Sequence, residues 1–297
     1  MTKINCSRYN EQVITTEINS STEMYCIFGM PVRHSFSPVI HNAAFNQLGI
    51  NAVYLAFEPP SIEDAIQSMR TLNILGASVT IPFKIDVIKH IDGIDQLAAR
   101  IGSVNTLVNW DGKITGFNTD GYGAIRALEN ENIPLGNATC LVIGNGGSAR
   151  AIAFTLLARG ASIIIAGRNV TRIEGLAAEL RKTEPSVRAV PLSDIDRKLM
   201  ETVDIIINTT PVGMSPDINA VPIDPGFISA RHTVFDIVYS PHMTKLLSAA
   251  EERGSTIVHG IEMLVHQGAR QFELWTGTSA PVETMRRAVL KHLQIGP

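Results

Sequence analysis

Hydrophobic and polar residues follow two different spacings along this chain. Short apolar runs rich in β-branched residues alternate with longer segments in which apolar residues recur every three or four positions. The first spacing predicts buried strands, and the second predicts helices that pack one face on a sheet. The predicted strands are residues 25–29, 51–57, 77–81, 103–109, 114–116, 141–143, 161–166, 189–190, 204–208, 233–239 and 256–258. The predicted helices are residues 38–48, 61–72, 84–90, 96–101, 120–129, 149–157, 171–182, 244–253, 261–275 and 281–293. This alternation is typical of an α/β fold.

The two ends of the chain differ from the middle. Residues 1–23 are polar and contain no hydrophobic run, so we expect a loose extension or a weakly docked arm and no secretory signal. Between about residues 140 and 258, strands and helices alternate as in a doubly wound sheet. After Gly260 the pattern is that of two long helices.

A glycine-rich turn connects the predicted strand 141–143 to the helix 149–157. The turn reads G-x-G-x-x-A, which is the Rossmann fingerprint with alanine in the third place. A strand that turns through glycines into a helix leaves backbone N–H groups and the positive end of the helix dipole directed at one spot, which suits a pyrophosphate. The predicted cofactor-binding residues of this turn are Gly144, Asn145, Gly146, Gly147 and Ser148.

The end of the next strand indicates which dinucleotide binds there. An NAD site places an acidic residue about 20 residues beyond the glycines, to hold the ribose hydroxyls. Here the chain has no acid and instead carries Gly167, Arg168, Asn169 and, four residues after the first arginine, Arg172. Two arginines suit a 2′-phosphate, because guanidinium groups form charge-assisted hydrogen bonds with phosphate oxygens. The alternative is a solvated loop with two basic residues. The sequence therefore predicts NADP.

Composition narrows the class of protein. The chain of 297 residues is long enough for two domains and has 45% hydrophobic and 18% charged residues, as in a globular enzyme. A net charge of −3 argues against a general role on nucleic acids or membrane surfaces. Three cysteines cannot form a disulfide framework, and no apolar stretch reaches the roughly 18 residues of a membrane span. We expect a cytoplasmic location.

Some polar residues have a structural and a functional explanation. Ser35 and Ser37 precede a proline that starts a helix, so their hydroxyls could cap the helix or hold a small oxygen-rich ligand. Asp120 opens the helix 120–129, and an aspartate there is more often a cap than a catalyst. The residues alone leave both questions open.

Seven short motifs, taken together and in order, point to one family. They are HSFSP, SVTIPFK, SVNT, NTDG, GNGGSAR, TTPVGM and MLVHQGA. From about residue 24 to its end, the chain resembles the shikimate dehydrogenase family. The resemblance implies a substrate-binding catalytic domain formed by residues 24–119 and 260–297, and a Rossmann-like NADP domain formed by residues 120–259. It also implies that the C-terminal helices return to the first domain.

The resemblance further implies a reaction and residues that perform it. The reaction is the reversible, NADP-dependent reduction of 3-dehydroshikimate to shikimate, a step in aromatic amino-acid biosynthesis. Ser35 and Ser37 would hold the substrate carboxylate, Lys84 would be the catalytic acid/base, and Asp120 would pair with it. Further substrate contacts match Thr80, Asn105, Gln267 and Tyr239. Met214, Ile237 and Gly260 match the positions at which the family's chain passes the nicotinamide.

The chain departs from the family pattern at four positions and leaves two other functions open. Ser78, Asn145, Gly167 and Glu262 stand where asparagine, alanine, asparagine and glycine are usual, and none belongs to the lysine–aspartate pair.

One alternative function is that of a quinate or dual-specificity dehydrogenase, although serine at position 37 in place of threonine favours shikimate. The other is an NADP-binding regulator without catalysis. We expect a monomer or homodimer. Hydride transfer requires no metal, and the eight histidines show no ligand spacing.

Overall fold

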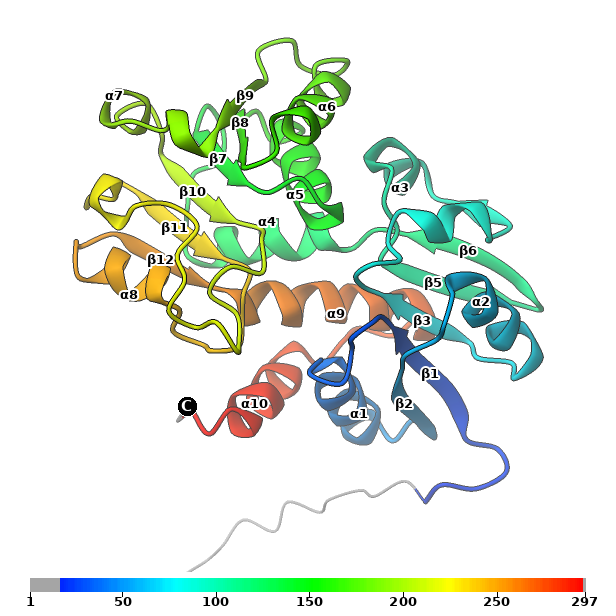
Figure 1. The fold of residues 1–297 in the computed structure, drawn as a ribbon. Coiled ribbons are helices and arrows are strands. Elements are labelled where there is room, and N and C mark those ends of the chain that lie inside the picture. The colour runs from blue at the N-terminus through cyan, green and yellow to red at the C-terminus, as the bar shows by residue number, and fades with distance from the viewer. Residues whose placement is uncertain (1–16, 296–297) are drawn as a thin grey trace, which may run out of the picture.

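The computed structural model describes residues 17–295, which form two α/β lobes connected side by side (Figure 1). The first lobe contains a mixed sheet of six strands in the order β2-β1-β3-β5-β6-β4. The three strands β1, β2 and β3 are parallel, and β5 and β6 form an antiparallel hairpin. The strands are β1 (Glu23–Phe28), β2 (Ala52–Phe57), β3 (Gly76–Val79), β4 (Gly93–Ile94), β5 (Thr106–Trp110) and β6 (Lys113–Phe117).

Helices cover both faces of this first sheet. On one face, α2 (Ile62–Thr71), the 3₁₀ helix η1 (Asp86–Lys89) and α3 (Gln96–Ile101) supply apolar residues to one core. On the other face, a second core joins α1 (Ser37–Leu48) with α9 (Gly260–Thr276) and α10 (Val282–His292). Trp275 fastens α9 to the sheet, because its indole N–H donates to the carbonyl of Leu107 at 2.9 Å. The prediction that the C-terminal helices return to the first domain is confirmed.

The second lobe is a doubly wound parallel sheet. Its six strands lie in the order β9-β8-β7-β10-β11-β12, so the strand order reverses between β7 and β10. Apolar cores on the two faces lie under the surrounding helices. The strands are β7 (Thr139–Ile143), β8 (Ser162–Gly167), β9 (Arg188–Pro191), β10 (Ile205–Asn208), β11 (Thr233–Asp236) and β12 (Thr256–His259). The helices are α4 (Asp120–Asn130), α5 (Gly147–Leu157), α6 (Val170–Leu180), α7 (Arg197–Met200) and α8 (Lys245–Glu251), with the 3₁₀ turns η2 (Leu192–Asp194) and η3 (Pro225–Phe227). The predicted Rossmann-like architecture is confirmed.

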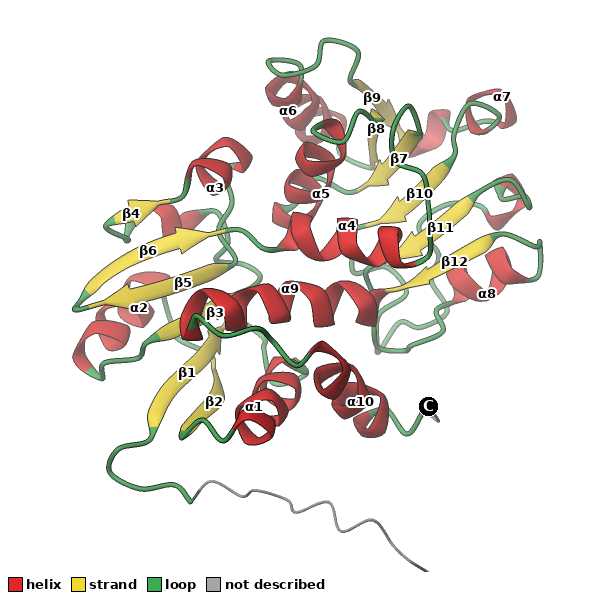
Figure 2. Ribbon diagram, turned by 180° about the vertical axis from the view of Figure 1, so that it is seen from behind, coloured by secondary structure: helices red, strands yellow, loops and turns green. Residues whose placement is uncertain are grey.

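Helix α4 lies between the two lobes and packs against both α5 and α9 (Figure 2). Two glycines in its first turn permit this close packing. A Cβ atom on Gly121 would come within 2.9 Å of the carbonyl oxygen of Ala151 in α5. A Cβ atom on Gly123 would come within 2.8 Å of the backbone of α9, at Met263 and Gln267. The N-terminus of α4 is therefore held in place by both neighbouring helices.

The edge strand β2 is partly covered by a side chain. The parallel register turns the backbone groups of Ala52, Tyr54 and Ala56 away from β1. The amide of Asn42, in α1, bonds to both groups of the middle residue: Nδ2 donates to the carbonyl of Tyr54 at 2.9 Å, and Oδ1 accepts its N–H at 2.8 Å. One side chain thus takes the place of a neighbouring strand.

Several element boundaries differ from the sequence predictions. The predicted helix 84–90 is a turn followed by the short η1, and residues 103–105 precede β5 instead of belonging to it. The reason is that these two segments bond to each other and to β3: Val104 N–H donates to the carbonyl of Lys84 at 2.8 Å, and Val79 N–H donates to that of Asn105 at 2.8 Å. The short β4 and α7 were not predicted.

The predicted N-terminal extension is described only in part. Residues 1–16 lie outside the described residues. Just before β1, the hydroxyl of Thr22 donates to the Asn51 side chain at 2.8 Å, which joins this segment to the residue preceding β2. Within the described part of the chain, no helix is both long and apolar enough to cross a membrane.

Candidate active site

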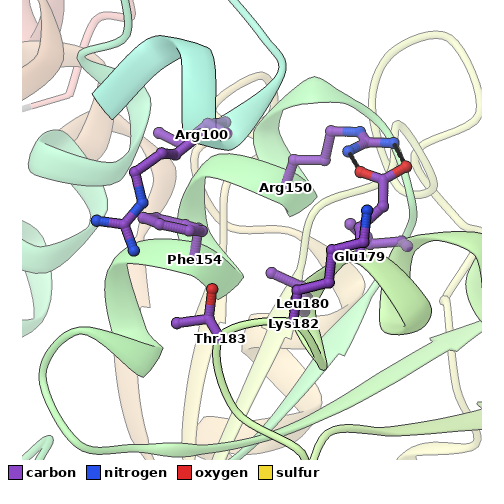
Figure 3. Close-up of a pocket in the computed structure, with 9 residues that line it drawn as sticks. Arg100, Arg150, Phe154, Glu179, Leu180, Lys182 and Thr183 are labelled. Atoms are coloured by element: carbon purple, nitrogen blue, oxygen red, sulfur yellow. Dashed lines mark hydrogen bonds and ion pairs between the residues drawn. The ribbon is translucent and has the colours of Figure 1, made fainter. Parts of the chain in front are cut away.

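A hollow between the lobes does not coincide with the predicted site. It has a volume of about 150 Å³ and lies between α3, α5 and α6 (Figure 3). Arg150, the last residue of the GNGGSAR motif, forms a two-pronged ion pair with Glu179 there, and Arg100 lies over the ring of Phe154 at 4.8 Å. None of the residues lining this hollow is a predicted site residue. Arg150 therefore joins α5 to α6 through this ion pair.

The predicted catalytic pair is in direct contact. Lys84 lies in the turn after β3, and Asp120 is the first residue of α4. The Lys84 Nζ atom lies 2.5 Å from Asp120 Oδ2, and the two side chains are 13% and 5% exposed. An ion pair this well shielded from water is held by its surroundings, since either group alone would pay a large desolvation cost. The two residues predicted to handle the proton are thus brought together.

Hydrogen bonds fix the orientation of the Asp120 carboxylate. Asn105 Nδ2 donates to Asp120 Oδ1 at 2.7 Å, leaving Oδ2 directed at Lys84. The side chain of Asn118 accepts the backbone N–H of Asp120 at 3.0 Å. Because Asn118 bonds to this backbone group and Thr119 is the N-cap residue, the carboxylate of Asp120 is not used as a cap. The alternative that Asp120 serves only as a helix cap therefore does not apply.

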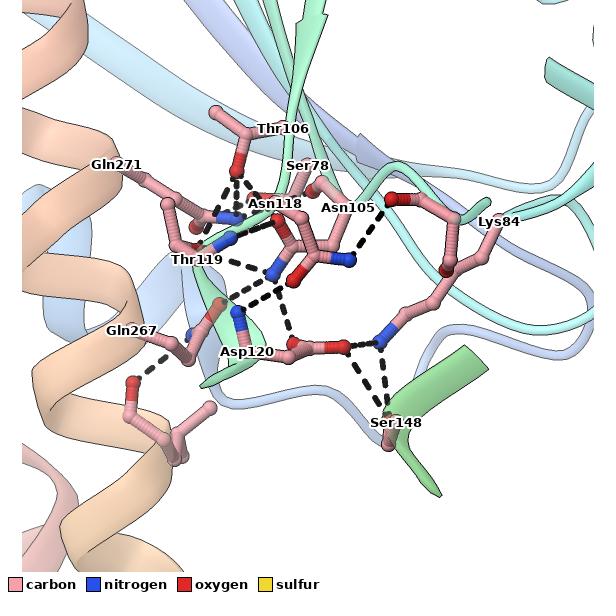
Figure 4. A network of polar contacts seen from close by, with 12 residues as sticks. Ser78, Lys84, Asn105, Thr106, Asn118, Thr119, Asp120, Ser148, Gln267 and Gln271 are labelled. Atoms are coloured by element: carbon pink, nitrogen blue, oxygen red, sulfur yellow. Dashed lines mark hydrogen bonds and ion pairs between the residues drawn. The ribbon is translucent and has the colours of Figure 1, made fainter. Parts of the chain in front are cut away.

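A wider polar network surrounds the pair (Figure 4). Gln267 Oε1 lies 3.4 Å from Asn105 Nδ2, which joins the predicted substrate contact in α9 to the pair. Sequence reasoning missed Thr106 and Gln271. Gln271 Nε2 donates to the Thr106 hydroxyl at 3.0 Å and to the Asn105 carbonyl at 3.1 Å. Gln271 lies one helical turn after Gln267, so helical spacing could have pointed to it.

The predicted carboxylate-binding serines form a second group. The hydroxyl of Ser35 lies 3.2 Å from that of Ser37 and also accepts the Ser37 backbone N–H. The N-cap residue of α1 is Phe36, and it makes no side-chain capping bond. The Tyr239 phenol interacts with Ser35, and burial raises the pKa of Tyr239 above its ordinary value. The hydroxyls of Ser35 and Ser37 and the phenol of Tyr239 therefore lie close together.

A buried chain of hydroxyls connects the two groups. Tyr54 OH donates to the Ser78 hydroxyl at 2.6 Å, which donates to Gln271 Oε1 at 2.8 Å. Burial raises the pKa of Tyr54, while its hydrogen bonds with Ser78 and Ser37 act in the opposite direction. The small side chain at position 78, where the family usually has asparagine, thus takes part in this chain. Thr80 lies apart: its N–H donates to the Phe28 carbonyl at 2.9 Å, and no described hydrogen bond joins its hydroxyl to the pair.

The glycine turn has the shape that a pyrophosphate requires. Gly144 follows β7 with φ +127°, and a Cβ atom there would meet Thr209 Oγ1, after β10, at 2.4 Å. The turn therefore lies where the strand order reverses, which is where such sheets bind ligands. Gly146 is the N-cap of α5 and has no side chain with which to cap the helix. A Cβ atom built on it would meet nothing within 4 Å, so the space beside the helix N-terminus is open. Its half-exposed neighbour Asn145 lies in the same turn.

The two arginines lie where the cofactor's 2′-phosphate is expected. Arg168 and Arg172 are exposed, and no ion pair of either occurs among the described contacts. Asn169 Oδ1 accepts the N–H of Arg172 at 3.0 Å, so this asparagine caps α6. A Cβ atom on Gly167 would meet Ile173 at 2.6 Å, which explains the departure from the family's asparagine by packing between β8 and α6. These residues fit a 2′-phosphate group.

The three residues predicted beside the nicotinamide lie beyond the ends of neighbouring strands. Ile237 N–H donates to the carbonyl of Asn208 at 3.1 Å. A Cβ atom on Gly260 would come within 2.6 Å of the backbone of Ile237, so only glycine fits between these segments. The loop that contains Met214 is bonded to the segment after Ile237, because Ser215 N–H donates to the carbonyl of Ser240 at 3.1 Å.

A buried carboxylate organises the same strand ends. Asp236, the last residue of β11, accepts hydrogen bonds from Asn208 Nδ2 at 2.9 Å, Val238 N–H at 3.1 Å and the Thr244 hydroxyl at 2.8 Å. Burial raises the pKa of Asp236 from 3.8 to about 6, although the three donors act in the opposite direction. Among the described residues, no group of histidine, cysteine and acidic side chains is arranged to hold a metal ion.

Comparisons with known proteins agree with this geometry. The shikimate dehydrogenase substrate binding domain matches residues 27–107, shikimate / quinate 5-dehydrogenase matches 127–216, and the shikimate 5′-dehydrogenase C-terminal domain matches 260–290. The shikimate dehydrogenase (NADP(+)) of Methanopyrus kandleri is 45% identical over 95% of this chain and 99% of its own. A shikimate dehydrogenase crystal structure in complex with NADP+ is 40% identical, covers 94% of this chain and 98% of its own, and has a TM-score of 0.89. The Thermus thermophilus shikimate 5-dehydrogenase, in complex with NADP(H) and shikimate, is 33% identical with a TM-score of 0.83, over 91% of this chain and 99% of its own. The chain therefore belongs to the shikimate dehydrogenase family.

Proposed function

We propose that this protein is an NADP-dependent shikimate dehydrogenase that reversibly reduces 3-dehydroshikimate to shikimate. The observation that carries the proposal is the buried pair of Lys84 and Asp120, 2.5 Å apart, beside the glycine turn of a Rossmann sheet. Oxidation of a secondary alcohol removes a hydride from carbon and a proton from oxygen, so the enzyme needs a proton-handling group next to the cofactor site. The pair meets this need.

Each end of the substrate has matching groups. Ser35, Ser37 and Tyr239 would bind the carboxylate, since their hydroxyls converge and can donate to its oxygens. Asn105 and Gln267 would bind ring hydroxyls beside the pair, and Thr80 is the remaining contact inferred from the family. Lys84 would exchange the proton with the alcohol oxygen, and Asp120 would orient the lysine. The neutral amides around the pair add hydrogen bonds without a competing charge.

The second lobe would hold the cofactor. Gly144, Gly146, Gly147 and the first backbone N–H groups of α5 fit the pyrophosphate, and Arg168 and Arg172 fit the 2′-phosphate. NADP, when bound, supplies the hydride chemistry. We place the boundaries of the two domains near Thr119 and Gly260, where the chain passes between the lobes, so that substrate and cofactor meet between them.

Steady-state kinetics with four combinations of substrates test the proposal. We expect the highest kcat/KM with NADP and shikimate, and lower values with NAD or with quinate, which has an additional ring hydroxyl. Comparable values for the two acids would establish the dual-specificity alternative. Binding of NADPH without oxidation of either acid would establish the regulator alternative and contradict the proposed reaction.

A further inference from the structure

The hydroxyl of Ser148 lies against the catalytic pair instead of serving its own helix. Ser148 Oγ is 3.3 Å from Lys84 Nζ and 3.3 Å from Asp120 Oδ2 (Figure 4). Ser148 is the second residue of α5 and belongs to the glycine turn predicted to bind the cofactor. A residue of the cofactor-binding turn thus touches both members of the proton-transfer pair.

We propose that Ser148 is a positioning residue that links the cofactor turn to proton transfer. Its hydroxyl accepts a hydrogen bond from Lys84 Nζ, donates one to Asp120 Oδ2, and fixes the direction of the remaining lysine donor. The inference rests on the proposed dehydrogenase function and assigns this side chain a role besides the pyrophosphate site.

Counting donors shows what the contact achieves. A lysine ammonium has three N–H groups and no acceptor. Asp120 Oδ2 takes one and Ser148 Oγ takes a second, so the third is left for a substrate oxygen. When Lys84 has given up a proton, the serine hydroxyl can still bond to it, because a hydroxyl is both donor and acceptor. Ser148 can therefore hold the lysine in both protonation states.

The backbone around Ser148 leaves its position little freedom. A Cβ atom on Gly147 would lie 3.2 Å from Lys84 Cδ and 3.3 Å from Lys84 Cβ, so the turn packs directly on the lysine stem. The close crossing of Gly121 with Ala151 fixes the start of α4, where Asp120 lies, against α5. The three side chains are thus positioned by three separate segments that touch one another.

Capping of helix α5 does not account for the contacts of the Ser148 hydroxyl. The N-cap of α5 is Gly146, and no side-chain hydroxyl caps this helix. The hydrogen bonds described for Ser148 Oγ go to Lys84 and Asp120. Nearby, the fully buried hydroxyl of Ser103 would be 2.7 Å from a Cβ atom on Gly147 and has no partner among the described residues. Ser103 therefore offers a matched control from the same contact between the lobes.

The test compares Ser148→Ala, Ser148→Thr and Ser103→Ala in the full-length enzyme. We expect Ser148→Ala to lower kcat about tenfold, the low end of the effect of losing hydrogen bonds to charged groups because both contacts are long at 3.3 Å, while the KM for shikimate and the Kd for NADPH stay within about twofold. The solvent deuterium isotope effect on kcat should increase, because proton transfer becomes slower relative to the other steps. Ser148→Thr, which keeps the hydroxyl, should restore most of kcat, and Ser103→Ala should retain the parent values.

A second readout requires no turnover. In the cofactor-free enzyme, an amine-acylating reagent should modify Lys84 faster in Ser148→Ala than in the parent, as measured by peptide mass spectrometry. An unchanged kcat with a lower KM for shikimate would mean that the serine only fills the place of the substrate hydroxyl, and would overturn the proposal. An equal loss in Ser103→Ala, or a loss confined to NADPH affinity, would also overturn it. A parent enzyme that oxidises neither acid overturns the proposed function itself, whereas an active parent with an unimpaired Ser148→Ala variant overturns only this role.

Discussion

At the scale of single residues, the pair of Lys84 and Asp120 depends on neutral neighbours. Asn105 and Ser148 bond to the aspartate without carrying charge, so Lys84 supplies the compensating cation. Asp120 is only 5% exposed, and a buried carboxylate that loses its cation is costly. The lysine therefore contributes both to the reaction and to the electrostatic balance of the site.

Replacing Lys84 by alanine should lower kcat by about 10²–10⁴, the usual contribution of a positioned acid/base. The Kd for NADPH should change little, because the groups proposed to bind the cofactor's phosphates are the first backbone N–H groups of α5 and the two arginines, and the substitution removes none of them. Stopped-flow and steady-state assays measure the rate, and fluorescence titration measures binding. Lys89→Ala is the control, since this lysine is 74% exposed and pairs with Asp86. An unimpaired kcat in Lys84→Ala would rule out the proposed mechanism.

The cofactor's phosphate gives a second prediction at this scale. Arg168→Ala should weaken NADPH binding on the order of tenfold to a hundredfold and leave NADH binding nearly unchanged, because a charge-assisted hydrogen bond contributes roughly 1.5–3 kcal/mol. Titrations with both cofactors measure the ratio. Arg181→Ala is a suitable control, since its guanidinium is bound to Glu174. The same NADPH-to-NADH ratio in Arg168→Ala and the parent would refute the assignment.

Sequence patterns predicted the site residues unevenly, for physical reasons. The glycine turn was recognisable because all its parts are local. Helical spacing places Gln271 on the same face as Gln267, but its partners could not be identified in this way, because it reaches Ser78 across 193 positions and Thr106 across 165, through contacts that exist only once α9 covers the first sheet. The departure at Glu262 likewise has a distant cause. Its carboxylate binds Arg286, at 2.8 Å, and so joins α9 to α10.

At the scale of elements, strand ends and short turns determine where the functional groups lie. The strand–turn–helix around β7 and α5 followed from spacing, whereas the predicted helix 84–90 did not form. There, backbone groups of Lys84 and Val104 bond to each other, and tertiary hydrogen bonds outweigh helix propensity. The end of β11 shows a related effect, because Asp236 is fully buried and bonds to three donors from adjoining segments.

Asp236 should make stability depend on pH in an unusual direction. Its pKa is raised from 3.8 to about 6 in the folded protein, so the folded state binds the proton more tightly than the unfolded state. The contribution of this group to the free energy of unfolding is greatest below pH 4 and is lost as the pH rises from about 4 to 6. The loss is of order 3 kcal/mol, from about two pKa units.

Urea denaturation of the parent and Asp236→Asn at pH 4, 5, 6 and 7 measures this contribution. The asparagine keeps one acceptor oxygen and cannot ionise, so the difference in unfolding free energy between variant and parent should shift in favour of the variant over that range. A difference independent of pH would show that this carboxylate does not titrate there.

At the scale of the whole molecule, two lobes meet along α4 and α9. The chain passes from the first lobe to the second before α4 and returns at the start of α9, and the two helices cross closely at Gly123. On the other side of α4, the turn around Gly147 presses on Lys84. The catalytic pair is therefore nearly enclosed where the lobes meet, and we expect the lobes to separate when substrate enters.

We expect NADPH and shikimate to shift the protein toward this closed arrangement, with bending at Thr119 and Gly260. Fluorescent labels at Gln96 in α3 and Lys182 after α6 lie on opposite lobes and would report the separation by energy transfer. Efficiency should increase when both ligands are added, with two labels inside the second lobe as the control pair. Identical efficiencies with and without ligands would contradict closure.

The side chain of Asn42 has a consequence for how the protein behaves at high concentration. A foreign strand that adds to the open edge of a sheet must bond to successive outward-facing residues, and such edges promote aggregation. Because the amide occupies Tyr54, the middle of the three outward positions of β2, no two successive positions remain available. Exposed Leu55 and Phe57 would otherwise make this strand an attractive template for a second chain. We therefore expect Asn42 to protect the apolar edge strand β2 from pairing with the same strand of a second molecule at high protein concentration.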